Sequence, residues 1–71
     1  MFGNIKKAIE ELESNLTLKS DYTEELEQLS QYEGDLPVLR SLGTPVWKIQ
    51  EAREHINRIR EWIKQEITAN A

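Results

Sequence analysis

The fold is decided by residues 45–68, which read PVWKIQEAREHINRIREWIKQEIT. The apolar side chains of this stretch recur every three or four residues, at Ile49, Ala52, Ile56, Ile59, Ile63 and Ile67. Such spacing places them on one face of an amphipathic helix. Thr44 and Pro45 mark its start, because a capping hydroxyl followed by proline is typical of a helix N-terminus. The stretch therefore predicts a long helix over residues 45–68.

Three segments before it also show helical signals. A first helix is predicted over residues 4–17, because apolar side chains recur every three or four residues at Phe2, Ile5, Ile9, Leu12 and Leu16. Leu18 is expected to pack where the chain turns after this helix. Residues 21–33 begin at the capping residue Asp21 and end before Gly34. Residues 36–42 form a short apolar segment that contains Pro37 and ends at Gly43. We expect an all-α fold, a small bundle of three longer helices plus one short helix, in one domain over residues 1–71. More than about 60% of the residues should be helical.

Length and composition exclude several classes of protein. The chain has 71 residues, a net charge of −4 and no cysteine. A chain this short buries a small core, so an assembly partner is plausible. The absence of cysteine excludes a disulfide framework, a thiolate zinc site and a cysteine nucleophile. No apolar run is long enough for a membrane span, and the N-terminus lacks a signal-peptide pattern, so we expect an intracellular location, cytoplasmic or nuclear.

Charge is divided unevenly along the chain. Residues 1–35 carry three basic and nine acidic side chains, a net of −6, and residues 36–71 carry six basic and four acidic ones, a net of +2. This asymmetry indicates either a bipolar surface or two halves that face each other within one fold, and antiparallel helices favour the second. The negative net charge makes nucleic-acid binding unlikely to be strong, because such binding rests on cations that neutralise phosphates.

The sequence offers little catalytic or metal-binding chemistry. His55 is the single histidine, and Glu51 lies one helical turn before it. These two side chains alone would leave a metal site under-coordinated, so they indicate a solvated helix flank. No nucleophile turn or phosphate-binding glycine loop is present. We therefore expect no enzyme activity, no metal, no cofactor and no small-molecule substrate.

The two tryptophans are the strongest candidates for a contact surface. On the wheel of the last helix, Trp62 lies beside the isoleucine stripe and Trp47 nearly opposite it. In one interpretation residues 36–42 fold back over Trp47 and the first helix covers Trp62. In the other, one tryptophan lies in an exposed contact patch, since tryptophan is common among interface anchors.

Other residues of the last helix complete the predicted contact set. Because the last helix is longer than the two long helices before it, its end should stay uncovered and leave Ile63 and Ile67 exposed beside Trp62. A basic flank on the same helix contains Arg53, Arg60 and Lys64, which face either acidic helices within the fold or phosphate outside it. The predicted partner-binding residues are Trp47, Trp62, Ile63, Ile67, Arg53, Arg60 and Lys64.

Part of the chain resembles the N-terminal helical domain of transcription elongation factor TFIIS. The resemblance covers residues 26–66 and rests on Leu26, Leu29, Leu39, the junction GTPVWKI at 43–49, Ile59, Trp62 and Ile63. It implies a helical bundle that holds short peptide motifs from disordered transcription partners. Gln50 and Glu51 stand where that family has a basic cluster, so no binding residue is carried over.

Taken together, these features predict a small non-enzymatic protein–protein interaction or regulatory module that acts through a helical-bundle surface. The expected partner is another protein chain, and a second copy in a weak homodimer is one candidate. Two alternatives stay open at this stage. In the first, the chain is a nucleic-acid-associated transcription regulator. In the second, it is a structural oligomer or an accessory subunit.

Overall fold

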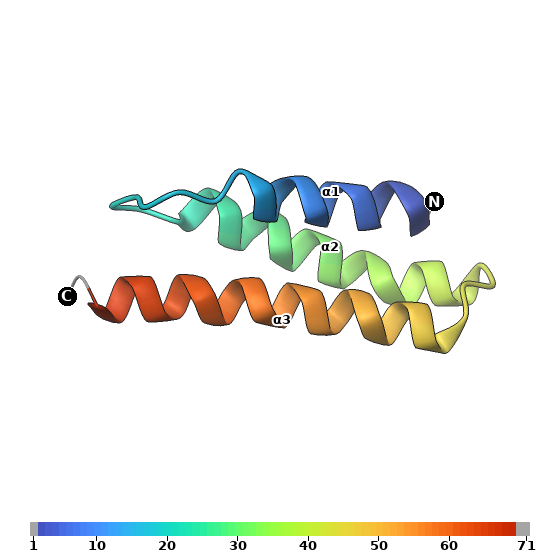
Figure 1. The fold of residues 1–71 in the computed structure, drawn as a ribbon. Coiled ribbons are helices and arrows are strands. Elements are labelled where there is room, and N and C mark those ends of the chain that lie inside the picture. The colour runs from blue at the N-terminus through green and yellow to red at the C-terminus, as the bar shows by residue number, and fades with distance from the viewer. Residues whose placement is uncertain (1, 70–71) are drawn as a thin grey trace.

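A computed structural model describes residues 2–69 and shows an all-α three-helix bundle, in which 82% of the described residues are helical and none lies in a strand. The helices are α1 (Phe2–Ser14), α2 (Thr23–Ser41) and α3 (Val46–Ala69). Successive helices run antiparallel along a bundle 42 Å long and 16 Å across (Figure 1). Residues 1, 70 and 71, which belong to the predicted domain, lie outside the described residues.

The predicted all-α fold is confirmed, but the predicted break between the second helix and the short one is wrong. Helix α2 continues through Gly34 and Pro37. Its buried residues Leu29, Leu36 and Leu39 form one stripe along the whole helix. A glycine and a proline in a helix cost about 1 and 3 kcal/mol, whereas burying two leucines contributes about 3–6 kcal/mol. The free energy gained by burying Leu36 and Leu39 against α3 is therefore large enough to offset the cost of Gly34 and Pro37 within the helix.

Helix α2 ends instead at the second glycine of the region. Gly43 has φ +105°, a conformation that residues with a Cβ rarely adopt. The backbone N–H of Gly43 donates to the Arg40 carbonyl and that of Thr44 donates to the Leu39 carbonyl, at 3.0 and 3.1 Å. These two bonds are those of a Schellman motif. Pro45 then prevents further continuation, and its carbonyl accepts the first backbone bonds of α3.

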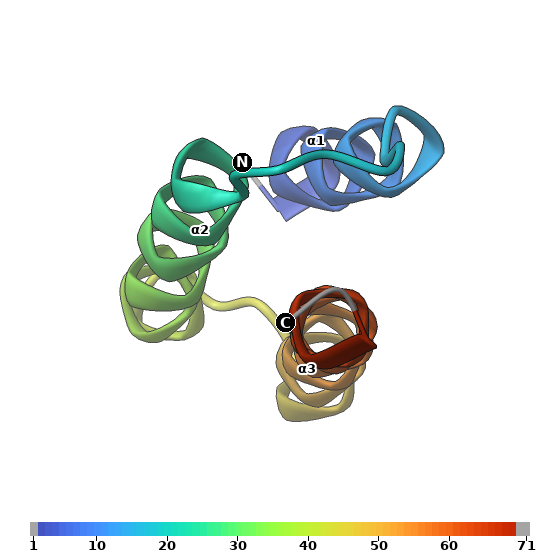
Figure 2. The same ribbon diagram turned by 90° about the vertical axis from the view of Figure 1, so that its left-hand side faces the viewer.

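The core lies where the three helical stripes meet. It contains Ile9 and Leu12 from α1, Leu29, Leu36 and Leu39 from α2, and Ile49, Ala52, Ile56, Ile59 and Ile63 from α3, together with Tyr22. The isoleucine stripe predicted over residues 45–68 is thus buried as far as Ile63. Seen along the bundle axis, α1, α2 and α3 occupy three corners, with α1 and α3 on one side (Figure 2).

Two polar contacts join the acidic first half of the chain to the second half. Arg60 donates to the Glu33 carboxylate at 2.8 Å and to the Ser30 hydroxyl at 3.3 Å, which ties α3 to α2. The His55 ring nitrogen Nε2 lies 2.9 Å from a carboxylate oxygen of Glu13, which ties α3 to α1. Part of the charge difference between the two halves of the chain is therefore matched by contacts within the fold, as expected for antiparallel helices.

Candidate protein-interaction surface

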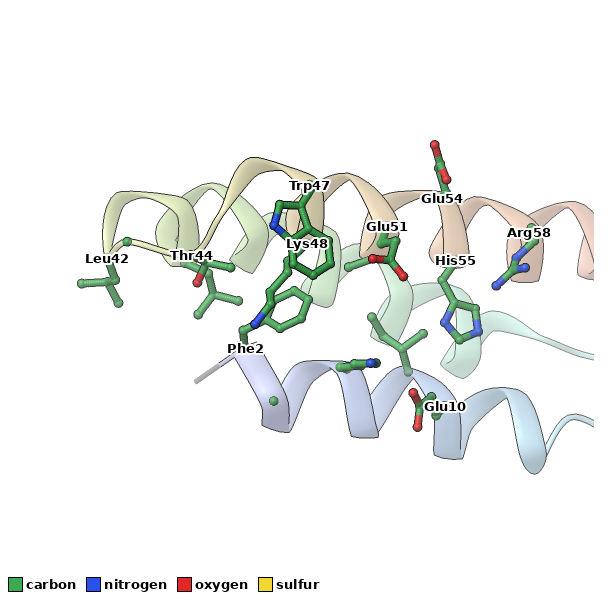
Figure 3. Close-up of a pocket in the computed structure, with 16 residues that line it drawn as sticks. Phe2, Glu10, Leu42, Thr44, Trp47, Lys48, Glu51, Glu54, His55 and Arg58 are labelled. Carbon is green, nitrogen blue, oxygen red and sulfur yellow. The ribbon is translucent and has the colours of Figure 1, made fainter.

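Exposed apolar side chains gather where α2 passes into α3. Val38, Leu42, Val46 and Trp47 are each more than half exposed, and we call these four residues the α2–α3 end patch. Helical spacing places Val38 beside Leu42 on α2. Leu42 and Trp47 line the same pocket at this end of the bundle (Figure 3). Large apolar side chains that cluster on a small protein's surface are typical of an interaction site.

Trp47 is exposed because nothing folds back over it. Residues 36–41 are the continuation of α2, Leu42 is its C-cap residue, and Leu36 and Leu39 are buried in the core with the isoleucine stripe. Trp47 points away from that stripe on the helical wheel and is 61% exposed. The interpretation in which residues 36–42 cover Trp47 is therefore wrong, and the alternative, an exposed tryptophan, is the one that the structure shows.

A lysine lies against the exposed ring. The Lys48 ammonium is 5.5 Å from the centroid of the Trp47 ring and 5.9 Å from that of the Phe2 ring. Both distances are those of cation–π contacts, which contribute about 0.5–1 kcal/mol at exposed sites. Lys48 thus links the start of α1 to the start of α3 and restrains the Trp47 side chain at the mouth of the pocket (Figure 3).

Behind the patch, an open groove of about 920 Å³ runs between α1 and α3. Its floor includes the apolar residues Ile9, Leu39 and Ala52, and its rims carry charges of both signs, among them Lys6, Glu10, Glu51 and Arg58. The groove is large enough for part of a peptide but shows no preference for one sign of charge. A net charge of one sign is found instead in the end turns of the bundle.

The end that carries the patch is basic. Residues 2–7 and 36–48 contain Lys6, Lys7, Arg40 and Lys48 and no acidic residue, so their side-chain charges sum to +4. These two segments form the first turns of α1, the last turns of α2 and the start of α3, which all lie at one end of the bundle (Figure 1). The end turns that carry the apolar patch are therefore basic, in a protein whose net charge is negative.

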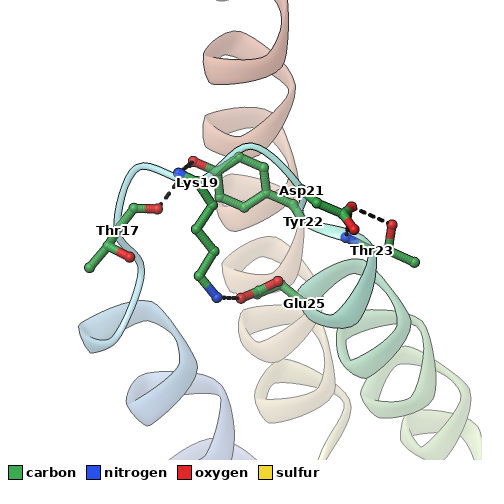
Figure 4. Close-up of polar contacts among 6 residues, drawn as sticks. All are labelled: Thr17, Lys19, Asp21, Tyr22, Thr23 and Glu25. Atoms are coloured by element: carbon green, nitrogen blue, oxygen red, sulfur yellow. Dashed lines mark hydrogen bonds and ion pairs between the residues drawn. The ribbon is translucent and has the colours of Figure 1, made fainter.

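The other tryptophan is built into the fold. Trp62 is partly buried and meets Tyr22 edge to face, with ring centroids 6.1 Å apart. Tyr22 is only 3% exposed. Its hydroxyl donates to the Thr17 carbonyl at 3.1 Å and accepts from the Lys19 backbone N–H at 2.9 Å (Figure 4). Trp62 consequently packs against the side chain that holds the α1–α2 loop, and its role in partner binding stays a prediction.

The remaining predicted contact residues are divided by the structure. Ile63 is 1% exposed, so the expectation that it lies uncovered is wrong, because α2 and the loop before it cover α3 as far as this position. Ile67, half exposed, is uncovered as expected. Of the basic flank, Arg60 is engaged with Glu33, whereas Arg53 and Lys64 are exposed.

The sequence alone did not identify Val38, Leu42 or Val46 as candidates. A continuous α2 would have revealed the first two, since Val38 and Leu42 fall away from the stripe of Leu29, Leu36 and Leu39 on one helical wheel. Assigning Val38 and Leu42 to a separate short helix concealed that signal. Leu18, which was expected to pack, is also exposed, at 74%.

The loop before α2 holds the best-defined polar contacts of the opposite end. The Asp21 carboxylate accepts from the Thr23 hydroxyl and, at 3.0 Å, from the Thr23 backbone N–H. These bonds lower the pKa of Asp21, with the side-chain bond as the larger cause. An ion pair joins Lys19 to Glu25 (Figure 4). Its hydrogen bond lowers the pKa of Glu25 and raises that of Lys19.

Other kinds of site are not assembled among residues 2–69. His55 contacts Glu13 rather than Glu51, and no three His, Asp or Glu side chains in that range lie close enough together to hold a metal ion. In the same range, no helix combines the length and apolar character needed to cross a membrane.

No family model matches the chain, and neither the curated proteins nor the solved structures include one significantly similar to it. The resemblance of residues 26–66 to the TFIIS N-terminal domain therefore stays a prediction.

Proposed function

We propose that this chain is a small, non-enzymatic protein-interaction module that binds another protein chain through the α2–α3 end patch. The observation that carries the proposal is the exposure of Trp47 together with Leu42 at one end of a bundle whose other large apolar side chains are mostly buried or partly buried. Tryptophan anchors dominate many protein interfaces because one side chain buries a large apolar area and still tolerates a polar border.

The exposed apolar side chains of the patch favour a role in binding rather than in the core. An exposed tryptophan contributes nothing to the core, and Leu42, Val46 and Val38 add apolar surface in the same region. Covering this surface on binding would return about 25 cal/mol per Å² of apolar area, part of which offsets the entropy lost on association. The patch therefore fits a module that associates reversibly.

Quantitative co-purification tests the proposal. Tagged wild-type protein, Trp47→Gln and Asn57→Gln are expressed in the cells that encode the chain, and the retained proteins are measured by mass spectrometry. Trp47→Gln removes the anchor, whereas Asn57→Gln changes an exposed residue of the same helix outside the patch and outside the predicted contact set. We expect a protein, either foreign or untagged copies of this chain, that wild type and Asn57→Gln retain and Trp47→Gln loses. Equal recovery with all three variants would contradict a role for the patch.

A nucleic-acid role is tested with the same three proteins. Fluorescence anisotropy with short DNA and RNA at low salt should show no tight complex, because the four cations at the patch end are outweighed by the negative remainder of the surface. Tight binding that Trp47→Gln abolishes would favour the nucleic-acid-associated alternative over a protein partner.

A further inference from the structure

The two ends of the bundle carry opposite charge. The basic end, formed by residues 2–7 and 36–48, has four basic side chains and no acidic one. The acidic end, formed by residues 18–28 and 61–69, has two basic and six acidic side chains, a net of −4. Antiparallel packing of the helices places these groups at opposite ends of the long axis (Figure 1). The molecule is therefore an electric dipole along its length.

The backbone adds to this polarity. Helices α1 and α3 both begin at the basic end, and only α2 ends there (Figure 1). A helix carries about half a positive charge at its N-terminus and half a negative charge at its C-terminus. In a three-helix bundle one of these dipoles is left without an opposing neighbour. Its positive pole lies at the basic end, in the same direction as the side-chain charges.

Both ends also present apolar side chains to solvent. The basic end carries the α2–α3 end patch, of which Leu42 and Trp47 are the largest exposed members. At the acidic end, Leu18 lies in the α1–α2 loop and Ile67 in the last turns of α3, and both are at least half exposed. The two ends thus match in apolar character and are complementary in charge.

We propose, building on the interaction module proposed above, that the partner bound at the α2–α3 end patch is a second copy of this chain, docked head to tail. The patch of one copy meets Leu18 and Ile67 of the next, with Arg40 and Lys48 facing acidic residues that include Asp21 and Glu24. A symmetric contact of two patches would instead bring eight cations together, which like-charge repulsion disfavours.

This geometry has two consequences. A head-to-tail contact leaves one basic and one acidic end free on every assembly, so it produces open chains rather than a closed dimer. The end faces of a bundle 16 Å across are small compared with a standard interface. Association is therefore expected to be weak, to grow with protein concentration and to decrease with salt.

The experiment uses one double variant for each end. Leu42→Gln with Trp47→Gln disables the basic end, and Leu18→Gln with Ile67→Gln disables the acidic end. All four side chains are exposed, so both proteins should keep the wild-type melting temperature. Asn57→Gln, at an exposed position of α3 between the two ends, serves as the control with both ends intact. Sedimentation velocity is measured from about 10 μM to about 1 mM, the range for a weak contact.

We expect the average mass of wild type and Asn57→Gln to rise with concentration, and each double variant to stay monomeric. An equimolar mixture of the two double variants should form a one-to-one complex, because one supplies an intact acidic end and the other an intact basic end. Raising the ionic strength from about 0.02 M to about 0.5 M should weaken each association about tenfold or more.

Three outcomes would overturn the proposal. Wild type that stays monomeric at every concentration excludes a second copy as partner, while the co-purification experiment still tests a foreign one. Association that survives in the acidic-end variant but not in the basic-end variant would indicate a symmetric patch-to-patch contact. Failure of the mixture to associate, although wild type does, would place the contact elsewhere on the bundle.

Discussion

The two tryptophans of α3 show how differently the two ends of this bundle are finished. At the acidic end, Trp62 packs against the buried ring of Tyr22, whose hydroxyl holds the preceding loop. At the basic end, the chain turns through Gly43 and leaves Trp47 in solvent. The same residue type on the same helix thus stabilises the fold at one end and is free to bind at the other. The difference arises from position on the helical wheel and from what the adjoining loop can reach.

The largest expected effect is the difference in stability between a core variant and a patch variant. Ile59 is 1% exposed and lies at the centre of the buried stripe of α3. Ile59→Ala should lower the free energy of unfolding by about 2–5 kcal/mol, the usual cost of emptying a buried site. Trp47→Ala should lower it by at most about 1 kcal/mol, because the side chain is mostly exposed and loses only the cation–π contact with Lys48. Urea denaturation followed by circular dichroism measures both, and similar losses for the two variants would contradict the assignment.

A second comparison measures how much the Tyr22 hydroxyl contributes to holding the α1–α2 loop at the acidic end. Tyr22→Phe keeps the ring against Trp62 and removes both hydrogen bonds of the hydroxyl, so it should cost about 1–2 kcal/mol. Tyr32→Phe is the matched control, since none of the hydrogen bonds described within residues 2–69 involves the Tyr32 hydroxyl. Thermal melts of the two proteins should differ. If both variants melt like wild type, the loop is not held by Tyr22.

The two glycines of the α2 region give a comparison with opposite signs. A Cβ at Gly34 would meet no atom within 4 Å, so Gly34→Ala should stabilise the helix by about 0.5–1 kcal/mol. Gly43 has φ +105°, and Gly43→Ala should destabilise the turn by about 1–2 kcal/mol. Chemical denaturation of both variants tests this pair. A loss of stability in Gly34→Ala would mean that α2 bends at Gly34 after all.

The smallest expected effect is a dependence on acid pH at the Asp21 loop. Because the folded state lowers the pKa values of Asp21 and Glu25 below 3.8 and 4.5, folding favours their ionised forms. Their contribution to stability is present above these ordinary values and is lost as the pH falls through the lower folded ones. Melting temperatures from pH 6 to about pH 2 should decrease, and Asp21→Asn should decrease less steeply. Parallel curves for the two proteins would show that the Thr23 contacts do not depend on the charge of Asp21.

Much of the fold followed from periodicity, and the errors concern the ends of α1 and the continuity of α2. The first helix, predicted over residues 4–17, spans Phe2–Ser14, so the prediction is wrong by two or three residues at each end. The isoleucine stripe of residues 45–68 fixed α3 to within one residue at each end, because a long stripe outweighs local preferences. Gly34 and Pro37 misled the assignment of α2, since their cost is local and the burial of Leu36 and Leu39 that offsets it is tertiary. Helix propensity alone cannot include that contribution.

The candidate surface was predictable only in part. The wheel position of Trp47 pointed away from the core, and the structure shows that side chain exposed. Ile63 was misplaced because the sequence does not reveal how far α2 and its loop extend along α3. The charge difference between the ends was also not readable from the linear sequence, since it depends on which helix ends meet. Residues 2–7 and 36–48 combine into one basic end only after antiparallel packing.

Acrylamide quenching of single-tryptophan variants tests the difference between the two ends most directly. Trp62→Phe leaves Trp47 as the only indole, and Trp47→Phe leaves Trp62. In dilute monomeric protein, Trp47 should emit at long wavelength and be quenched nearly as fast as free tryptophan, whereas Trp62 should emit at shorter wavelength and be quenched several-fold more slowly. Equal quenching of the two indoles, or a shielded Trp47 in the monomer, would contradict the assignment of Trp47 to an open binding end and Trp62 to the fastening of the fold.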